Sequence, residues 1–350
     1  MNPFERQKVS RARIMVVGCG ALGNEVIKNL ALLGVEHLLL VDFDRVEPSN
    51  LSRSILFSRQ DALQARLKVD AAKEAVQRIN PAAEVRTICA DVAFDVGLGE
   101  FRACDVVVGC VDSRWARYCI NRQCMRAGVP WVDGGITLTE GTARVFAPGR
   151  NCYACNLGEE GLSELRRRQP CSGTIRRAEA SGSVPTTSIT ASVIGAVQAQ
   201  EALKIVCGEP SLCGRMFYYD AETVEARVSE FAAWDDDCPS HESWDPVEDS
   251  ALSVESTVGE MLASYDSFSL HDNCFVDYVY SRADDSSRKL MLPGHKVEEV
   301  ADPALFYQNE YRSIDRDFPY KGLKLKDLGI PCNDIVRAFA GGREHFVKIH

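Results

Sequence analysis

The sequence predicts an α/β fold with a doubly wound, mostly parallel sheet, followed by a small α+β module. Apolar runs of strand length alternate with stretches of helical periodicity between residues 13 and 146. A glycine-rich turn joins the first of these strands to the first helix. Alternation of this kind is typical of a parallel sheet that carries helices on both faces.

Each element follows from its local pattern. Strands of the sheet are expected at residues 13–17, 37–42, 84–90, 104–112 and 129–135. Amphipathic or apolar helices are expected at residues 21–34, 59–80, 114–128 and 186–208. After Phe146 the pattern becomes loop-rich up to Pro185, and two antiparallel strands are expected at 215–221 and 225–231.

The chain is expected to divide into two domains. Residues 1–242 form the large one, which contains a polar loop at 156–185. The acidic, Ser-rich residues 243–252 are interpreted as a linker, and residues 253–350 as a separate α+β module. In this module the Gly341-Gly342 pair is followed by eight more residues and predicts a hairpin turn rather than a conjugatable tail.

Composition excludes several classes of function. The net charge of −10 disfavours nucleic acid as a main partner, because phosphate backbones are held chiefly by Lys and Arg. The charged N-terminal residues predict no signal peptide, and the apolar runs are too short for a membrane span. We therefore expect a cytoplasmic protein whose fourteen cysteines are reduced thiols, most of them buried and some ligating metal or reacting.

The glycine-rich turn predicts a nucleotide site. Gly18, Gly20 and Gly23 fit the pattern G-x-G-x-x-G between a strand and a helix, as in Rossmann-like folds. Such glycines allow a close backbone approach to phosphate at the helix N-terminus. Asp42 ends the second strand, where a ribose-binding carboxylate belongs. These features alone also fit an NAD-dependent oxidoreductase.

The residues that follow favour a nucleoside triphosphate. Two carboxylates, an amide and two cations occur in order, and a further Asp ends a later strand; they are Asp42, Asp44, Asn50, Arg53, Lys68 and Asp112. Cations clamp phosphates, and carboxylates hold magnesium. Taken singly, Arg53 and Lys68 are typical surface charges. The prediction of a nucleoside triphosphate site therefore depends on all six residues occurring together in this order.

Two pairs of residues have the spacing of zinc ligands. Cys152 and Cys155 form C-x-x-C, and Cys238 and His241 form C-x-x-H. Two such pairs suit a tetrahedral structural Zn²⁺, which accepts imidazole as readily as thiolate. The alternatives are an unmetallated pair of loops and, with less support from the context, a redox C-x-x-C.

Residues 12 to about 242 resemble the adenylation domain shared by ubiquitin-activating enzymes and their bacterial relatives ThiF, MoeB and HesA. The resemblance is carried by "GCGALGNE", "VDFDRVEPSNLSR", Lys68, "CVDS", "PWVDGG" and "CYAC". It implies that MgATP activates the C-terminal carboxylate of a ubiquitin-like protein. By this resemblance Asp42 binds ribose, Asn50, Arg53 and Lys68 contact phosphates, and Asp112 holds magnesium.

The resemblance also implies a homodimer and a zinc site with His241 in place of a cysteine. Family members often use an N-terminal Arg that reaches the partner's active site. Arg6 is the best candidate here, although its spacing fits poorly. Ubiquitin-activating enzymes end in a module of about the size of residues 253–350, which receives a conjugating-enzyme-like carrier. An accessory module with no carrier role is an equal alternative.

Cys171 is the candidate nucleophile for a second step. It lies in a polar segment beside Arg166, Arg167, Arg168, Arg176 and Arg177, which favour the reactive thiolate. The family places its reactive Cys in this region, where attack on an acyl-adenylate would leave a thioester. An idle cysteine in an exposed loop is the alternative, and Cys213, Cys274 and Cys332 are rival nucleophiles.

The sequence therefore predicts ATP-dependent adenylation of a ubiquitin-like protein, thioester formation on Cys171 and transfer to a carrier. Three alternatives remain open. The first is a sulfur-carrier adenylyltransferase without a thioester step. The others are an NAD-dependent oxidoreductase and a nucleotide-binding scaffold without turnover.

Overall fold

The computed structural model describes residues 3–158, 160–161, 165, 186–231, 234–270, 276–281, 289–291, 305–311, 313–318 and 320–350. Its described residues belong to two compact units. The first lies within Met1–Val92, Phe101–Leu162 and Ser183–Ser243, and the second includes Ala93–Glu100 and Trp244–His350. Within the described residues, no helix has the length and apolar character needed to cross a membrane.

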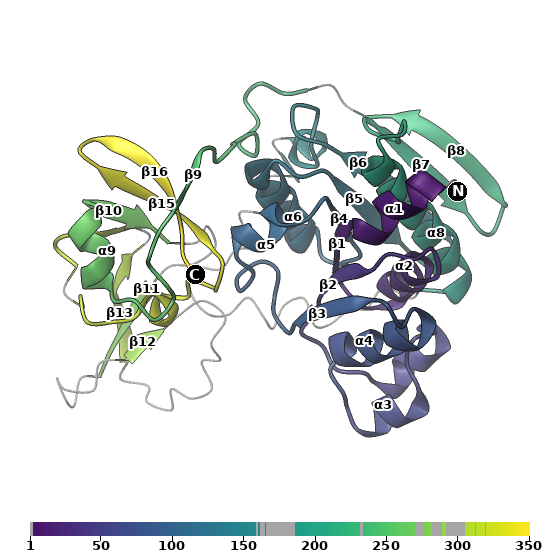
Figure 1. Cartoon of the computed structure of the whole chain (residues 1–350), viewed down its shortest axis with the longest axis horizontal. Coiled ribbons are helices and arrows are strands. Elements are labelled where there is room, and N and C mark those ends of the chain that lie inside the picture. Colours follow the sequence, from purple (N-terminus) through teal and green to yellow (C-terminus); the bar gives the residue numbers. More distant parts are fainter. Residues whose placement is uncertain are drawn as a thin grey trace. The chain divides into compact units, whose positions relative to one another are not determined.

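The first unit contains an eight-stranded sheet in the order β3-β2-β1-β4-β5-β6-β7-β8 (Figure 1). The first five strands in this order pair in parallel, and the last four pair antiparallel. The strands are β1 (Arg13–Val17), β2 (His37–Val41), β3 (Glu84–Ile88), β4 (Val106–Gly109), β5 (Trp131–Ile136), β6 (Glu140–Phe146), β7 (Arg215–Asp220) and β8 (Glu225–Glu230). The doubly wound α/β prediction is confirmed.

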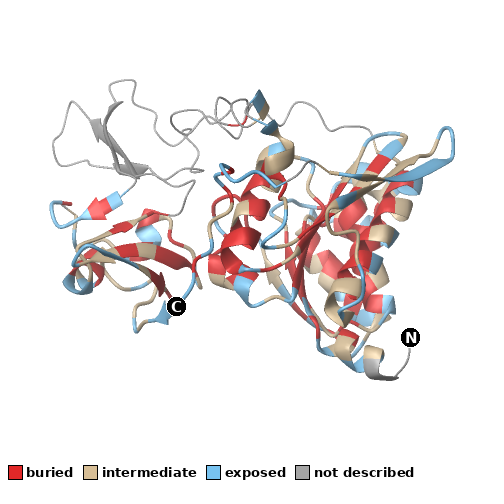
Figure 2. Ribbon diagram, turned by 90° about the horizontal axis from the view of Figure 1, so that it is seen from above, coloured by how far each residue is buried: buried red, intermediate tan, exposed pale blue. Residues whose placement is uncertain are grey.

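Helices cover both faces of this sheet. On one side lie α2 (Ala21–Leu32), α4 (Lys68–Ile79) and α8 (Ser188–Cys207), and on the other lies α6 (Arg114–Ala127) (Figure 1). Alternate strand residues such as Val16, Leu40 and Val108 join the first three helices in one buried core, visible between the layers in Figure 2. Gly195 lets α8 approach α2, because a Cβ there would lie 2.6 Å from the Glu25 Cβ.

Two features of the first unit differ from the sequence-based expectation. The helix expected at 59–80 is two helices, α3 (Arg59–Leu63) and α4, and Lys68 is the first residue of α4. The break lies at Ala65, whose φ of +45° is left-handed, and a helical pattern in the sequence does not reveal it. Strand β6 was not expected; it continues the sheet from β5 to the β7–β8 hairpin.

The remaining helices of the first unit are short or terminal. They are α1 (Pro3–Arg11), the 3₁₀ turns η1 (Pro48–Ser52) and η2 (Ala154–Asn156), and α5 (Leu98–Arg102), which begins in the second unit. Arg6 lies exposed on α1. The loop containing Cys171 and its neighbouring arginines lies outside the described residues, as does Cys274.

The second unit holds a five-stranded sheet in the order β14-β10-β15-β16-β9. Its elements are β9 (Val247–Asp249), α9 (Val258–Ser264), β10 (Ser267–Ser269), β14 (Ser313–Asp315), η5 (Leu325–Leu328), β15 (Ile335–Ala340) and β16 (Arg343–Lys348). A three-stranded sheet contains β11 (Val276–Ser281), β12 (Lys289–Met291) and β13 (Leu305–Tyr311). Gly341 and Gly342, both at positive φ, join β15 to β16 as the expected hairpin.

The expected linker at 243–252 is in part ordered structure. Its residues Val247–Asp249 form β9, which pairs in parallel with β16, and Trp244 is buried and stacks on Phe346. An acidic, Ser-rich composition favours a linker only on average, whereas a three-residue strand is held through its backbone and needs no apolar run.

Candidate nucleotide site and metal centre

The glycine-rich turn lies between β1 and α2, at the carboxyl edge of the parallel strands. Gly18 has a φ of +94°, and a Cβ on it would lie 2.6 Å from the carbonyl oxygen of Cys110. A Cβ on Gly23 would lie 1.9 Å from the Gly18 carbonyl oxygen. By contrast, no described atom lies within 4 Å of a Cβ built on Gly20, the N-cap of α2. The turn thus leaves open space at a helix N-terminus, where phosphate binds readily.

Asn24 holds this turn in place, a role that the sequence pattern did not reveal. Its buried side-chain amide donates to the carbonyl oxygens of Cys19 at 2.8 Å and Gly20 at 3.1 Å. Its Oδ1 accepts from the backbone N–H of Leu56 at 2.8 Å. The available signal was a polar residue on the apolar face of the helix expected at 21–34.

Asp42, Asp44 and Lys68 form one contiguous charged group beside the turn. Asp42 directly follows β2 and accepts backbone N–H bonds from Cys19 at 2.7 Å and Asp44 at 2.8 Å. Lys68 Nζ lies 2.7 Å from Asp44 Oδ2. Burial raises the pKa of Asp42. Burial lowers the pKa of Lys68, but Asp42 and Asp44 outweigh this and raise it, so Lys68 is a cation at neutral pH.

Asn50 lies on η1, and Arg53 follows its last residue. Both side chains form hydrogen bonds to backbone atoms of this same turn. Asn50 Oδ1 accepts from the Glu47 backbone N–H at 2.9 Å, and Arg53 Nη1 donates to the Ser49 carbonyl oxygen at 3.1 Å. The segment after η1 is tied to the glycine turn through the bond between Leu56 and Asn24. No described contact joins Asn50 or Arg53 to Lys68.

Asp112 is exposed just beyond β4, on the same carboxyl edge. The backbone N–H of Cys110 donates to the Val17 carbonyl oxygen at 2.7 Å, which keeps this extension of β4 beside β1 and its glycine turn. Ligands of open α/β sheets bind at such an edge. The structure therefore places Asp112, the glycine turn and the Asp42–Lys68 group on one edge of one sheet.

Cys152, Cys155, Cys238 and His241 converge as the sequence predicts, with one ligand atom each and all four atoms within 4.8 Å of one another. The Cys152 sulfur lies 3.7 Å from both Cys155 Sγ and Cys238 Sγ. Tetrahedral zinc with Zn–S bonds of about 2.3 Å separates two sulfurs by about 3.8 Å. The donor set and its spacing therefore fit a structural Zn²⁺.

Neighbouring groups support this centre. The contact with Cys238 and the adjacent Asn121 side chain lower the pKa of Cys152, although burial opposes the shift, and the same contact raises the pKa of Cys238, so that Cys152 is the thiol of this pair that loses its proton first. A thiolate is the form that binds metal. The Trp234 ring stacks on the His241 imidazole with centroids 3.6 Å apart and fixes its plane. Asn121 also accepts from the Tyr153 backbone N–H at 2.9 Å, which anchors the C-x-x-C turn to α6.

The nucleophile assignment stays a prediction, because Cys171 lies outside the described residues. Among its rivals, Cys213 is half-buried and burial raises its pKa, while Cys332 is exposed.

Comparisons with known proteins agree on one family. Residues 2–240 match the model of the ThiF family. A protein named SAMP-activating enzyme E1 from Haloferax volcanii is 32% identical over 269 residues, covering 73% of this chain and 92% of that protein. The molybdopterin-synthase adenylyltransferase of Salmonella typhimurium is 34% identical over 232 residues, covering 64% and 85%. The bovine adenylyltransferase and sulfurtransferase MOCS3 is 34% identical, but the match covers only 44% of it.

A solved structure supports the fold. The crystal structure of E. coli MccB with AMPCPP and MccA has a TM-score of 0.56 and 21% identity, covering 69% of this chain and 70% of that one. At this identity the likeness concerns the fold alone. The family match spans more than half of the sequence, and the Haloferax relative is matched over almost its whole length. The chain therefore belongs to the ThiF family.

Proposed function

We propose that this chain, an ATP-dependent adenylyltransferase of its family, uses MgATP to activate the C-terminal carboxylate of a ubiquitin-like protein. The observation that carries the proposal is the open turn at Gly20 beside Asp42 and the ion pair of Asp44 with Lys68. This arrangement offers phosphate both a helix N-terminus and a cation.

In the proposed reaction, a carboxylate oxygen of the substrate attacks the α-phosphorus of ATP, and the bond to the β-phosphate breaks. Pyrophosphate leaves with its electron pair and an acyl-adenylate remains. Asp42 is assigned to the ribose, and Lys68, Arg53 and Asn50 to the phosphates. Asp112 is assigned to the Mg²⁺ that offsets the developing phosphate charge.

Exchange of labelled pyrophosphate into ATP tests this proposal, with the ubiquitin-like protein encoded nearest to this gene as substrate. Asp112→Ala is expected to abolish exchange. The matched control is Asp105→Ala at the amino end of the same strand, where Asp105 accepts from the Arg13 backbone N–H. Asp105→Ala should retain exchange. Calorimetric titration should detect ATP binding, and tight NAD binding without ATP binding would contradict the proposal.

We further propose that Cys171 accepts the acyl group as a thioester and passes it to a conjugating-enzyme-like carrier. The names of two relatives support the sulfur-carrier alternative, since one is a molybdopterin-synthase adenylyltransferase and another joins an adenylyltransferase to a sulfurtransferase. That alternative needs adenylation but no thioester. A role of residues 253–350 in receiving the carrier stays a prediction.

We also propose a homodimer in the cytoplasm, in which Arg6 of α1 serves the partner's nucleotide site. The exposure of Arg6 supports this role. Light scattering at micromolar concentration tests the dimer, and a monomer there would remove any role of Arg6 in trans.

A further inference from the structure

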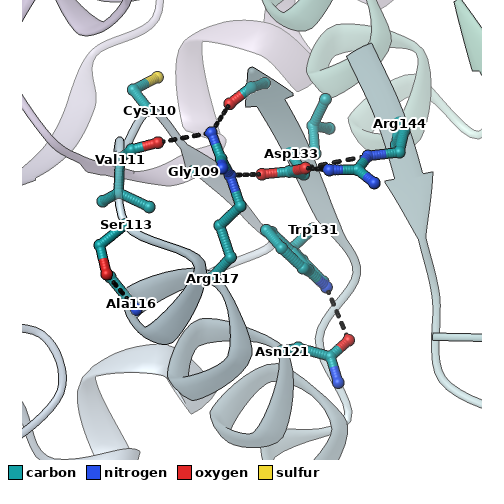
Figure 3. A network of polar contacts seen from close by, with 12 residues as sticks. Gly109, Cys110, Val111, Ser113, Ala116, Arg117, Asn121, Trp131, Asp133 and Arg144 are labelled. Atoms are coloured by element: carbon teal, nitrogen blue, oxygen red, sulfur yellow. Dashed lines mark hydrogen bonds and ion pairs between the residues drawn. The ribbon is translucent and has the colours of Figure 1, made fainter. Parts of the chain in front are cut away.

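Asp133 is a fully buried carboxylate that two arginines share. It lies on β5, and its Oδ1 accepts from Arg117 Nε of α6 at 3.0 Å. Its Oδ2 accepts from Arg144 Nε of β6 at 3.0 Å and also from Arg144 Nη2 (Figure 3). Two neighbouring strands, β5 and β6, and the helix α6 are thus joined at one buried charge. Neither the proposed nucleotide contacts nor the zinc centre uses these residues.

Arg117 links this network to the carboxyl edge of the sheet, where the nucleotide is proposed to bind. Its Nη2 donates to the carbonyl oxygen of Val111 at 2.7 Å and to that of Gly134 at 3.1 Å. Val111 immediately precedes Asp112, so the guanidinium holds the peptide that bears the proposed magnesium ligand (Figure 3). Burial lowers the pKa of Arg117, but Asp133 outweighs this and raises it, so the guanidinium remains charged.

Asp133 and Arg144 fix the direction of the Arg117 guanidinium. Two carbonyl oxygens and one carboxylate oxygen accept from the N–H groups of a planar fork, which a lysine cannot match. Arg144 is itself held, because its guanidinium lies over the Tyr153 ring, with the carbon 5.3 Å from the centroid. Tyr153 lies between the two cysteines of the C-x-x-C pair.

We propose that Arg117, Asp133 and Arg144 are positioning residues that hold the Val111–Asp112 peptide where Asp112 can bind magnesium. The proposal rests on the proposed function, since it assigns the metal to Asp112. A purely structural network would change stability alone. A positioning network must change the response of the reaction to magnesium.

The test measures pyrophosphate exchange against free Mg²⁺ at saturating ATP, together with the thermal midpoint. Asp133→Asn keeps the side-chain shape but offers one acceptor and leaves two partly buried guanidinium groups without their carboxylate. We expect its half-saturating Mg²⁺ concentration to rise about tenfold. This is the low end of the loss in metal affinity that follows when a residue supporting a metal ligand is replaced. Excess magnesium should restore much of the rate. Arg117→Lys should shift the same quantity in the same direction.

The matched control is Glu201→Gln. Glu201 is also a buried, ion-paired carboxylate of the first unit, 2.6 Å from Lys204 Nζ, but it lies near the end of α8. The Glu201→Gln variant should have a lower thermal midpoint than the wild type, but the same half-saturating Mg²⁺ concentration. If Asp133→Asn does not fold, Arg144→Lys replaces it; this variant keeps the charge and should give a smaller shift in the same direction.

The Asp112→Asn variant distinguishes the assignment of magnesium to Asp112 from the positioning role of the network. An unchanged magnesium response in Asp112→Asn overturns the magnesium assignment itself. A raised half-saturation in Asp112→Asn with none in Asp133→Asn, Arg117→Lys or Arg144→Lys overturns the positioning role alone. A lower thermal midpoint with wild-type magnesium response in these variants also overturns the positioning role, because it reveals a network that only stabilises the fold.

Discussion

Lys68 is bound to Asp44 twice. Its Nζ lies 2.7 Å from Asp44 Oδ2, and its backbone N–H donates to the Asp44 carbonyl oxygen at 2.9 Å. The backbone bond fixes the start of α4 against the segment that follows β2, and the side-chain bond then aims the ammonium group toward Asp42. The position of the Lys68 ammonium group is therefore set by these two bonds to Asp44.

Lys68→Ala should reduce pyrophosphate exchange by about 100-fold or more, the usual cost of removing a group that stabilises developing charge. Lys28→Ala is the matched control, since Lys28 also pairs with a carboxylate three residues away on its helix, Glu25. This control should stay near the wild-type rate. Exchange that survives in Lys68→Ala would remove Lys68 from the phosphate site.

Much of the proposed nucleotide edge was predictable in its placement, because its residues follow strands directly. Gly18 and Asp42 stand where β1 and β2 end, and strand ends are visible as the limits of apolar runs. The Arg117–Asp133–Arg144 network was not predictable. Its members lie on three elements, and the sequence does not give the register that pairs Asp133 with Arg144 across β5 and β6. The break before Lys68 was not predictable either, because it lies at Ala65, whose left-handed φ of +45° leaves no mark on the helical pattern of the sequence.

The second prediction concerns zinc. Purified protein that has met no chelator should contain about one zinc per chain by elemental analysis. Cys155→Ser should lose the metal and lower the thermal midpoint by roughly 6–12 °C, which corresponds to a loss of about 3 kcal/mol. Cys213→Ser, which alters a half-buried cysteine outside the cluster, is the control and should keep its zinc.

His241→Cys sharpens this test. A fourth thiolate suits tetrahedral zinc as well as imidazole does, so this variant should retain the metal, whereas His241→Ala should lose it. Wild-type protein without zinc, or a His241→Ala variant that keeps a full equivalent, would contradict the four-ligand assignment.

The third prediction is a pH dependence in the second unit. Glu255 receives bonds from Lys324 and Lys326, which lower its pKa from 4.5 to about 2. A carboxyl with a lowered folded-state pKa contributes stability above its unfolded pKa of 4.5, and this stability is lost as the pH falls toward 2. Wild type should therefore exceed Glu255→Gln in thermal midpoint at pH 6, with the difference disappearing in acid.

Because Glu255 is exposed, the difference should be small and should shrink in 0.5 M salt, an ionic strength at which the screening length is only roughly 4 Å. The exposed Glu222, for which Glu222→Gln is the control, should give no such acid-dependent difference. A wild-type advantage that persists unchanged at pH 2 would show that Glu255 acts through packing rather than charge.

The fourth prediction separates adenylation from acyl capture. Asp112 and Lys68 are proposed to serve the adenylate, and Cys171 to attack its carbonyl carbon, expel AMP and hold the acyl group as a thioester. Cys171→Ala should therefore exchange pyrophosphate near the wild-type rate but form no thiol-sensitive adduct with the ubiquitin-like protein. Asp112→Ala should fail in both assays, because no adenylate is made.

The choice of Cys171 depends on its setting among five nearby arginines, which favour a thiolate at neutral pH. Burial instead raises the pKa of Cys213, which makes it a poorer nucleophile. Cys213→Ala should thus keep the adduct and serves as the control. An adduct that survives Cys171→Ala would move the nucleophile to Cys213, Cys274 or Cys332. Strong exchange in wild type with no adduct would leave Cys171 without a catalytic role and favour the sulfur-carrier reaction, in which the adenylate itself is the product handed on.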